Sequence, residues 1–321
     1  MYQQGSIVQL ARGQYRLREP LGGSAYGVVW RADGPGSKGS VALKLVNREQ
    51  MARAPSSLRS HWFDSARTET EFLSHLAPWD GRHIVRLLDS GSHEGLPAMA
   101  LELLDGDLAH HLARERAAGR VTSAAQAQDW AAQVNQALAK VHAAGFRYLD
   151  LKPGNLLVER ATRCLKLADF GTSRKLAQAP TQAYAGTANW QAPEQFFPRE
   201  DGVYLAGWRS DYFALGALLY YLVCGQLLRY GAACAQAYRL HGREGAQHLR
   251  AQHGGVPPVL RADEAARFAG AFRQAGAQAT QLLRRLLAAA PGERPCHALE
   301  ISRMLGAVHE AMARPPMEQA A

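Results

Sequence analysis

The chain changes from a strand-forming pattern to a helix-forming pattern near residue 104, and this change limits the folds open to it. Before that point, short runs rich in β-branched and aromatic residues alternate with glycine-rich turns, which is typical of strands. These runs cover residues 15–21, 27–32, 41–46, 84–89 and 98–104, and a helix is expected at about 57–76. After Asp105-Gly106 amphipathic stretches dominate, the first starting with a capping box at Ser123 to Gln126. The pattern predicts an α+β chain with a small β-rich part and a larger helical part.

The composition excludes several classes of protein. With 47% hydrophobic and 20% charged residues over 321 positions, the chain is expected to fold rather than to remain disordered. Its four cysteines are widely spaced and form no Cys-x-x-Cys pair, which argues against a zinc ribbon or a disulfide framework and favours a reducing, cytoplasmic location. The start of the chain lacks a signal-peptide pattern, and the most apolar stretch, 213–228, is too short to span a bilayer. We therefore expect no membrane association.

An excess of basic residues gives the chain a net charge of +9, from 37 Lys and Arg against 28 Asp and Glu. A GC-rich genome can produce such a bias toward arginine and alanine, while a functional interpretation is a preference for anionic partners. No run of five basic residues is present, so nucleic acid is not expected as a partner. Residues 229–261 hold five arginines and one glutamate. This segment is interpreted either as a solvated, partly flexible excursion or as a docking surface for an acidic protein partner.

Two features of the strand-rich part are suited to binding phosphate. The glycine-rich segment 21–29 lies between two expected strands, where small residues let backbone N–H groups approach phosphate oxygens. Lys44 ends the next strand and offers a fixed cation, which needs a carboxylate to hold it. On the following helix, Glu69 shares the face of the apolar residues three, four and seven positions later, so it is expected to point inward, whereas Glu71 points away.

The most specific motif lies between a helix and a strand in the helical part. The string Asp-x-Lys-Pro-x-x-Asn places Asp150 as a base, Lys152 as a cation and Asn155 as a neutral metal ligand on one loop. Asp169-Phe170-Gly171 follows a short strand further along. A carboxylate at a strand end, with a glycine after it, is suited to holding Mg²⁺ through oxygen.

These motifs, in this order along the chain, resemble those of the eukaryotic-type (Hanks-type) serine/threonine protein kinase family, in the form found in bacteria. Residues 186–194 resemble the end of that family's activation segment. Ser210-Asp211 resembles the start of its buried large-lobe helix, and Arg294 resembles the arginine that pairs with Glu194. The resemblance covers about residues 14–308.

The resemblance implies a bilobal protein-kinase fold that uses ATP and Mg²⁺ and phosphorylates a Ser or Thr hydroxyl of a protein substrate. An N-terminal extension is expected at 1–13 and a C-terminal tail at 309–321. Between them, the kinase domain is expected to have its N-lobe at about 14–103 and its C-lobe at about 104–308.

The resemblance also implies a role for each matching residue. Lys44 would contact the α- and β-phosphates and pair with Glu69, Asp150 would take the proton of the acceptor hydroxyl, and Lys152 would stabilise the moving phosphoryl group. Asn155 and Asp169 would hold the metal ion. The residues implied for the nucleotide are Leu21, Gly22, Gly23, Ser24, Gly27, Val29, Ala42, Lys44, Glu102, Leu104, Asp107 and Leu157.

Within the nucleotide set, Val29, Ala42 and Leu157 are expected to sandwich the adenine ring. The stretch from Glu102 to Leu104 would form the adenine-binding hinge, after Leu101 as the gatekeeper. Asp107 is expected to reach the ribose.

Two departures from the family pattern bear on function. Ser24 stands where the second loop glycine is usual, and its small hydroxyl could reach a phosphate. The His-Arg-Asp triplet reads Tyr148-Leu149-Asp150, so the arginine that pairs with a phosphate on the activation segment is missing. That switch is not expected in its usual form, and Arg174 and Lys175 remain as alternative basic partners.

Two functions from other classes stay open. One is a pseudokinase scaffold, which the joint presence of Lys44, Glu69, Asp150, Asn155 and Asp169 argues against. The other is a small-molecule phosphotransferase of the aminoglycoside-kinase type. Enzymes of that type generally lack an activation segment ending in Ala-Pro-Glu, which this chain has at 192–194.

Overall fold

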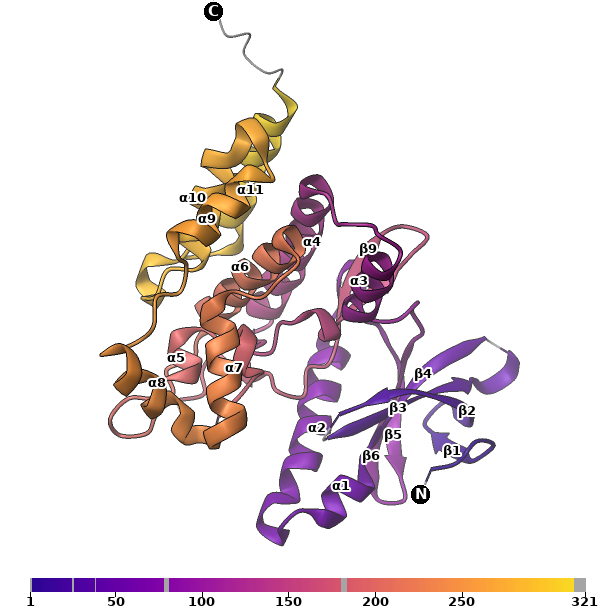
Figure 1. Ribbon diagram of the computed structural model, residues 1–321. Coiled ribbons are helices and arrows are strands. Elements are labelled where there is room, and N and C mark those ends of the chain that lie inside the picture. The colour runs from indigo at the N-terminus through magenta and orange to yellow at the C-terminus, as the bar shows by residue number, and fades with distance from the viewer. Residues whose placement is uncertain (1, 25, 38, 78–80, 180–183, 315–321) are drawn as a thin grey trace, which may run out of the picture. The chain divides into compact units, whose positions relative to one another are not determined.

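The chain forms two compact units in the computed structural model, which describes residues 2–314 except 25, 38, 78–80 and 180–183. The first unit consists of Met1–Gly106 and Leu157–Ser173, and the second of Asp107–Leu156 and Arg174–Ala321. The first holds a sheet and the second is mainly helical, in agreement with the change of pattern in the sequence (Figure 1).

The first unit is built on a six-stranded sheet with the strand order β1-β2-β3-β4-β6-β5. All neighbouring strands in it are antiparallel. The elements of this unit are β1 (Ile7–Leu10), β2 (Gly13–Gly23), β3 (Gly27–Asp33), β4 (Ser40–Val46), α1 (Arg48–Arg53), α2 (Ser60–His75), β5 (Leu87–His93), β6 (Leu96–Glu102), β8 (Leu156–Glu159, whose first residue belongs to the second unit) and β9 (Cys164–Leu167).

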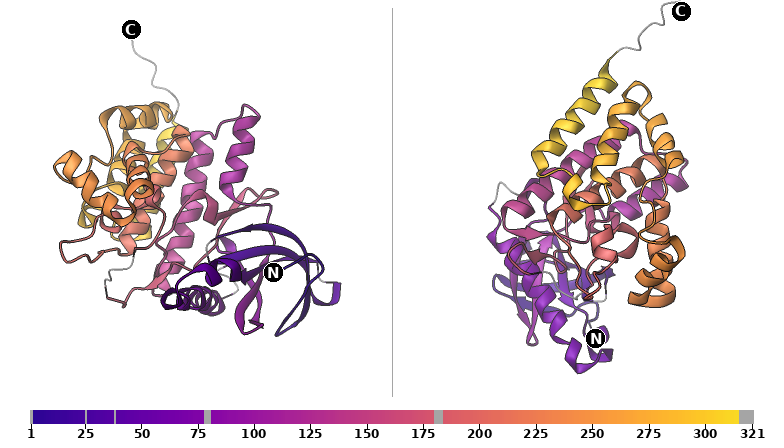
Figure 2. Two further views of the ribbon diagram at one scale, coloured as in Figure 1. Left: turned by 60° about the horizontal axis from the view of Figure 1, so that its bottom comes forward. Right: turned by 90° about the vertical axis from the view of Figure 1, so that its left-hand side faces the viewer.

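Alternation along the strands decides which side chains are buried. In β2, Tyr15 and Leu17 are buried while Arg16 and Arg18 between and after them are exposed, as expected for a sheet with one covered face. In β4, Leu43 and Leu45 add to the same core. Helix α2 packs against β4, β5 and β6, and Figures 1 and 2 show it beside these strands. This packing sets the helix and strand β4 side by side.

The edges of the sheet differ from the sequence expectations. Residues 7–10, within the expected N-terminal extension, form β1 and pair with β2, because Val8 and Leu10 bury their side chains in the sheet core. The strand expected at 84–89 begins later, at Leu87, and Ile84 instead forms an isolated parallel bridge with Leu167.

Residues 157–173 return to the first unit, although the expected lobe boundary placed everything after 104 in the second lobe. Backbone hydrogen bonds cause this return. The N–H of Val85 donates to the carbonyl of Leu167 at 2.9 Å, and the N–H of Leu167 donates to the backbone carbonyl of His83 at 2.9 Å. The Asp105 N–H donates to the carbonyl of Val158 at 3.0 Å. Asp169 therefore belongs to the same unit as Lys44.

The second unit gathers the long helices around α6 (Trp208–Cys224), which is buried on nearly every side. A helix that is apolar all round belongs in the centre of a bundle. Figures 1 and 2 show the helices of this unit clustered together. Its other elements are α3 (Leu108–Ala117), α4 (Ala124–Ala143), β7 (Phe146–Arg147), β10 (Arg174–Lys175), α5 (Pro193–Phe196), α7 (Arg229–His241), α8 (Gly245–His253), α9 (Ala262–Gly270), α10 (Gly276–Leu286) and α11 (Ala298–Ala313).

Helix α4 starts where the sequence predicted. Ser123 is its N-cap, and the Ser123 hydroxyl accepts a hydrogen bond from the Gln126 N–H at 3.1 Å. Within the described part of the chain, no single helix is long and apolar enough to cross a membrane. Only α6 joined to the stretch 229–253 across a bend of 110° meets that test.

The arginine-rich segment 229–261 is ordered as helices rather than as an irregular excursion. Helices α7 and α8 bury Tyr230, Cys234 and Leu249. The ring of Tyr238 on α7 stacks on Tyr184, with centroids 4.8 Å apart and an interplanar angle of 11°. An ideal Cβ on Gly231 of α7 would lie 2.3 Å from the carbonyl oxygen of Asn189. This close approach packs α7 directly onto the segment that contains Asn189.

We predict that Gly231→Ala lowers the free energy of unfolding by about 1–3 kcal/mol, because the new methyl group overlaps a backbone oxygen. The matched control is Gly306→Ala on α11, where a Cβ meets no atom within 4 Å. That change should raise the free energy of unfolding by about 0.5–1 kcal/mol, since alanine is the better helix former. Denaturant titration measures both, and equal effects of the two substitutions would contradict the close packing of α7.

Candidate active site

Strand register places the nucleotide-facing candidates of the first unit on one face of the sheet. Val29 of β3 lies opposite Lys44 of β4, and Ala42 lies opposite Leu101 of β6. Side chains directly opposite each other, and those two apart on one strand, share a face. Val29, Ala42, Lys44 and Leu101 therefore share a face.

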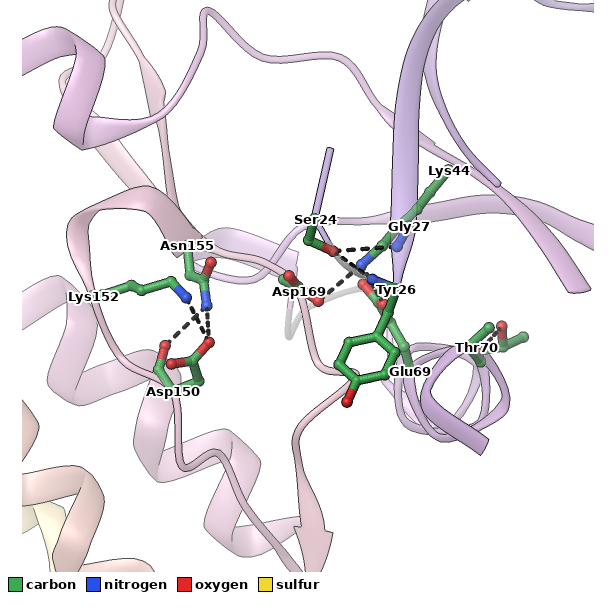
Figure 3. A network of polar contacts seen from close by, with 11 residues as sticks. Ser24, Tyr26, Gly27, Lys44, Glu69, Thr70, Asp150, Lys152, Asn155 and Asp169 are labelled. Carbon is green, nitrogen blue, oxygen red and sulfur yellow. Dashed lines mark hydrogen bonds and ion pairs between the residues drawn. The ribbon is translucent and has the colours of Figure 1, made fainter. Parts of the chain in front are cut away.

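Lys44 binds two carboxylates in the first unit. Its Nζ lies 2.6 Å from Oε2 of Glu69 and 2.9 Å from Oδ1 of Asp169 (Figure 3). Glu69 is 1% exposed, so the predicted inward orientation of this side chain is observed. The Asp169 side chain is 40% exposed and retains access to solvent. The ammonium is thereby held between a buried anion and an open one.

The surroundings of Lys44 keep it protonated. Burial by itself would lower the pKa of Lys44, but the charges of Asp169 and Glu69 outweigh burial and raise the pKa above its ordinary value. Burial raises the pKa of Glu69, and the Lys44 charge opposes that rise.

Phe72 of α2 stacks on Phe170 with ring centroids 4.3 Å apart, which fixes the helix against the residue that follows Asp169.

The glycine-rich segment closes on itself in the first unit. The Ser24 N–H donates to the carbonyl of Gly27 at 2.7 Å, and the Ser24 hydroxyl accepts hydrogen bonds from the N–H groups of Tyr26 at 3.3 Å and Gly27 at 3.2 Å (Figure 3). Ser24 thus braces the turn from within, a role that its sequence position did not reveal. The segment helps to line a cavity formed by Ser24, Tyr26, Gly27, Lys44, Leu45, Val46, Ser65, Ala66, Glu69, Pro97, Met99 and Asp169.

The remaining nucleotide candidates of the first unit are Leu21, Gly22, Gly23, Glu102, Leu104 and Leu157. Gly22 and Gly23 end β2, Leu21 beside them is exposed, and Leu104 and Leu157 are half-buried in the first unit. Glu102 ends β6, and its carboxylate binds the Lys166 ammonium at 2.7 and 2.9 Å, a partner that the sequence analysis did not foresee.

Asp107, expected at the ribose, begins the second unit and serves as the N-cap of α3. Its carboxylate accepts a hydrogen bond from the His110 N–H at 2.9 Å and lies 2.6 Å from the His110 ring nitrogen Nδ1. The same residue therefore starts the helix that follows the hinge stretch, and its carboxylate already has two partners.

In the second unit, the catalytic-loop residues form a closed ring of hydrogen bonds. Lys152 Nζ donates to Oδ2 of Asp150 at 2.8 Å and to the Thr187 hydroxyl at 2.8 Å. The Thr187 hydroxyl in turn donates to Oδ1 of Asp150 at 2.7 Å. The structure thus brings Asp150 and Lys152 together as predicted and adds Thr187 to them.

Asn155 has an orientation that suits an oxygen ligand. Its Nδ2 donates to the backbone carbonyl of Asp150 at 2.9 Å and to Oδ2 of the same residue at 3.1 Å, and Figure 3 shows the amide oxygen pointing away from Asp150. Carboxylate and amide oxygens are the ligands that Mg²⁺ prefers. Asn155 with its oxygen turned outward, and Asp169 with its open carboxylate, therefore fit the metal-binding role that each was assigned.

A buried carboxylate on α6 fixes the loop that carries Asp150. Asp211 accepts hydrogen bonds from the backbone N–H of Tyr148 at 2.8 Å and of Leu149 at 2.7 Å, and its Oδ2 lies 2.8 Å from Nε2 of His142. Leu149 has a φ of 71°, a left-handed conformation that a leucine adopts only when its surroundings impose it. In the sequence, Asp211 is a charged residue inside the otherwise apolar run 210–223, and this position indicates a buried structural role.

The pairing expected between Arg294 and Glu194 is present. The guanidinium of Arg294, 1% exposed, contacts both carboxylate oxygens of Glu194 at 2.6 and 2.8 Å. The Ser210 hydroxyl donates to the same carboxylate at 2.5 Å. The end of the 186–194 segment is therefore anchored to the helical core.

Comparison with known sequences identifies the family, because the family model described as the protein kinase domain matches residues 15–305 of the chain. The chain belongs to the protein kinase family. The predicted family and the predicted bilobal α+β fold are thereby confirmed.

Bacterial kinases are among the relatives of this protein kinase, as the sequence analysis expected. The chain is 33% identical over 232 residues to the serine/threonine-protein kinase PkaA of Streptomyces coelicolor, covering 66% of the chain and 39% of that protein. It is 30% identical over 222 residues to the serine/threonine-protein kinase PknA of Mycobacterium tuberculosis, covering 67% and 47%. The chain therefore spans less than half the length of these relatives.

A solved structure gives the same fold. The kinase domain of Mycobacterium tuberculosis PknI matches with a TM-score of 0.63 over 96% of this chain and 100% of that one. Since the two sequences are 22% identical, this likeness supports the fold alone.

Proposed function

We propose that this protein kinase transfers the γ-phosphoryl group of ATP, in the presence of Mg²⁺, to a Ser or Thr hydroxyl of a protein. The observation that carries the proposal is the retention of both sets of kinase residues in ordered contacts. Lys44 is bound to Glu69 and Asp169, and Asp150 is bound to Lys152 and Thr187.

The residues of the first unit bind and orient the nucleotide in this proposal. Lys44 supplies a permanent positive charge for the α- and β-phosphates, and its carboxylate partners hold the ammonium in one position. Asp169 and Asn155 would hold Mg²⁺ through oxygen, and the bound ion would supply positive charge to neutralise the phosphates.

The residues of the second unit act on the acceptor. Asp150 orients the hydroxyl and accepts its proton, and Lys152 stabilises negative charge on the moving phosphoryl group. Thr187 bridges these two side chains, so a hydroxyl already hydrogen bonds to Asp150 in the free protein. The proposed Ser/Thr specificity is supported by the resemblance to serine/threonine protein kinases, in which Lys152 and Thr187 match the residues usual for that class.

The two rival functions predict different outcomes. A pseudokinase scaffold would bind partners without transfer, and the contacts of Lys44 with Glu69 and Asp169 and of Asp150 with Lys152 argue against it. A small-molecule phosphotransferase would act on an aminoglycoside-type acceptor, but the anchored Ala-Pro-Glu end, with Glu194 on Arg294, supports a protein acceptor. A cytoplasmic setting and an acidic docking partner for 229–261 are part of the same proposal.

We predict that Asp150→Asn lowers the rate of phosphoryl transfer by about a hundredfold or more, since the general base is lost while the size of the side chain is kept. The measurement is transfer of the γ-phosphate from radiolabelled ATP to a protein extract and, in parallel, to aminoglycosides.

The matched control is Asp129→Asn, an exposed position on α4 of the same unit, which should transfer at the wild-type rate. Near-wild-type transfer by Asp150→Asn would refute the assignment of the base. Transfer by the wild type to aminoglycosides alone would establish the small-molecule alternative, and no transfer to any acceptor would favour the scaffold.

We predict that Asp169→Ala removes the Mg²⁺-dependent part of ATP binding. Loss of a charged ligand should weaken ATP affinity in Mg²⁺ by about tenfold or more, and affinity in EDTA should change little. Calorimetric titration in both buffers measures this, with Asp64→Ala, an exposed position on α2, as the control. If Asp169→Ala bound ATP-Mg²⁺ as tightly as the wild type, Asp169 would not be a metal ligand.

A further inference from the structure

An ion pair of the first unit joins the end of β6 to the short strand β9. The Nζ of Lys166 on β9 donates to Oε1 of Glu102 at 2.7 Å and to Oε2 at 2.9 Å. The two residues are 64 positions apart in the sequence, and both belong to the first unit. Glu102 begins the 102–104 stretch that is expected to bind adenine, and Lys166 is its charged partner.

The core sets the position of Lys166. Leu165 and Leu167, on either side of it in β9, are 1% and 0% exposed. Successive side chains of a strand point to opposite faces, so Lys166 leaves β9 on the face opposite to these two leucines. Burial of the leucines therefore fixes the point from which the lysine reaches Glu102.

The carboxylate of Glu102 is held from a second side as well. Its Oε1 accepts a hydrogen bond from the N–H of Arg86 at 2.9 Å, and the N–H of Glu102 donates to the carbonyl of Arg86 at 3.0 Å. Glu102 is thus bound through both its side chain and its backbone. Because Glu102 is the last residue of β6, these contacts determine where the strand ends and the 102–104 stretch begins.

Folding stability alone does not account for this pair. The side chains of Lys166 and Glu102 are only 12% and 13% exposed, so both charges lose much of their hydration. Apolar residues of similar volume often stabilise such a position as well as an ion pair does, or better. A charge-assisted hydrogen bond differs from an apolar contact in its directionality, and the direction it fixes here is that of Glu102.

We propose that Lys166 is a positioning residue for adenine, which acts through Glu102 by holding the 102–104 stretch in the shape that binds the base. The proposal rests on the proposed function, in which this protein kinase binds ATP. Binding groups that neighbouring hydrogen bonds hold in place recognise a ligand better than groups that must be ordered when the ligand arrives. Lys166 therefore affects recognition of the base and leaves recognition of the phosphates to Lys44 and Asp169.

The test is calorimetric titration of the full chain with two probes. Adenosine carries the base without phosphates, and magnesium tripolyphosphate carries phosphates without the base. Lys166→Met, which keeps the length of the side chain and removes its charge, should weaken adenosine binding by about tenfold or more, since a charge-assisted hydrogen bond is lost. The affinity for magnesium tripolyphosphate should stay at the wild-type value.

Two further variants separate positioning from a general loss of structure. Lys166→Arg keeps the positive charge and should recover most of the adenosine affinity. Arg18→Met removes an exposed ion pair with Asp33 in the same unit and should bind both probes like the wild type. Melting temperatures are measured in parallel. A purely structural role for Lys166 would lower the melting temperature and the affinity for both probes together, and that result would overturn the proposal.

A double variant keeps the test decisive if Lys166→Met does not fold. Lys166→Met combined with Glu102→Gln leaves no unpaired charge and should still bind adenosine about tenfold or more weakly, because the ionic contact is absent. Wild-type adenosine affinity in Lys166→Met or in the double variant would overturn the proposal and leave the proposed function intact. A wild type that binds neither adenosine nor ATP would overturn the proposed function, and this inference with it.

Discussion

The ion pairs of Lys44 are the interaction on which the first unit depends. They join strand β4, helix α2 and the end of the returning segment 157–173 through one ammonium group. Glu69 is almost fully buried, so without Lys44 its carboxylate would be an unpaired charge in the core. Asp169 is partly open to solvent while it contacts the same ammonium, which is consistent with the metal-binding role proposed for it. This difference in burial distinguishes the carboxylate of Glu69, enclosed in the core, from that of Asp169, which solvent can reach.

A buried carboxylate also fixes the reactive part of the second unit. Asp211 holds the backbone of Tyr148 and Leu149, and this hold imposes the left-handed conformation at Leu149 just before Asp150. Strain at one residue is offset by two charge-assisted hydrogen bonds to backbone N–H groups. Each unit thus presents its reactive side chains from a scaffold that a buried charge fixes.

The sequence predicted those parts of the site that local spacing determines. The inward orientation of Glu69 follows from its helical distance to Phe72 and Leu73, and the pairing of Arg294 with Glu194 followed from the family resemblance. The return of 157–173 and the strand β1 depend on backbone pairing between distant segments, which hydrophobic pattern alone does not encode. The pairing of Lys166 with Glu102 has the same origin, since it depends on the hydrogen bonds that return β9 to the first unit.

The central claim is that Lys44 and Glu69 stabilise each other as a buried pair, and a double-mutant cycle in the free energy of unfolding tests it most directly. Lys44→Met alone should cost about 3–5 kcal/mol, because Glu69 is left buried without a cation beside it. Lys44→Met combined with Glu69→Gln should recover most of that loss, which appears as a strong coupling energy between the two positions. Costs that simply add, with no recovery in the double variant, would contradict the account.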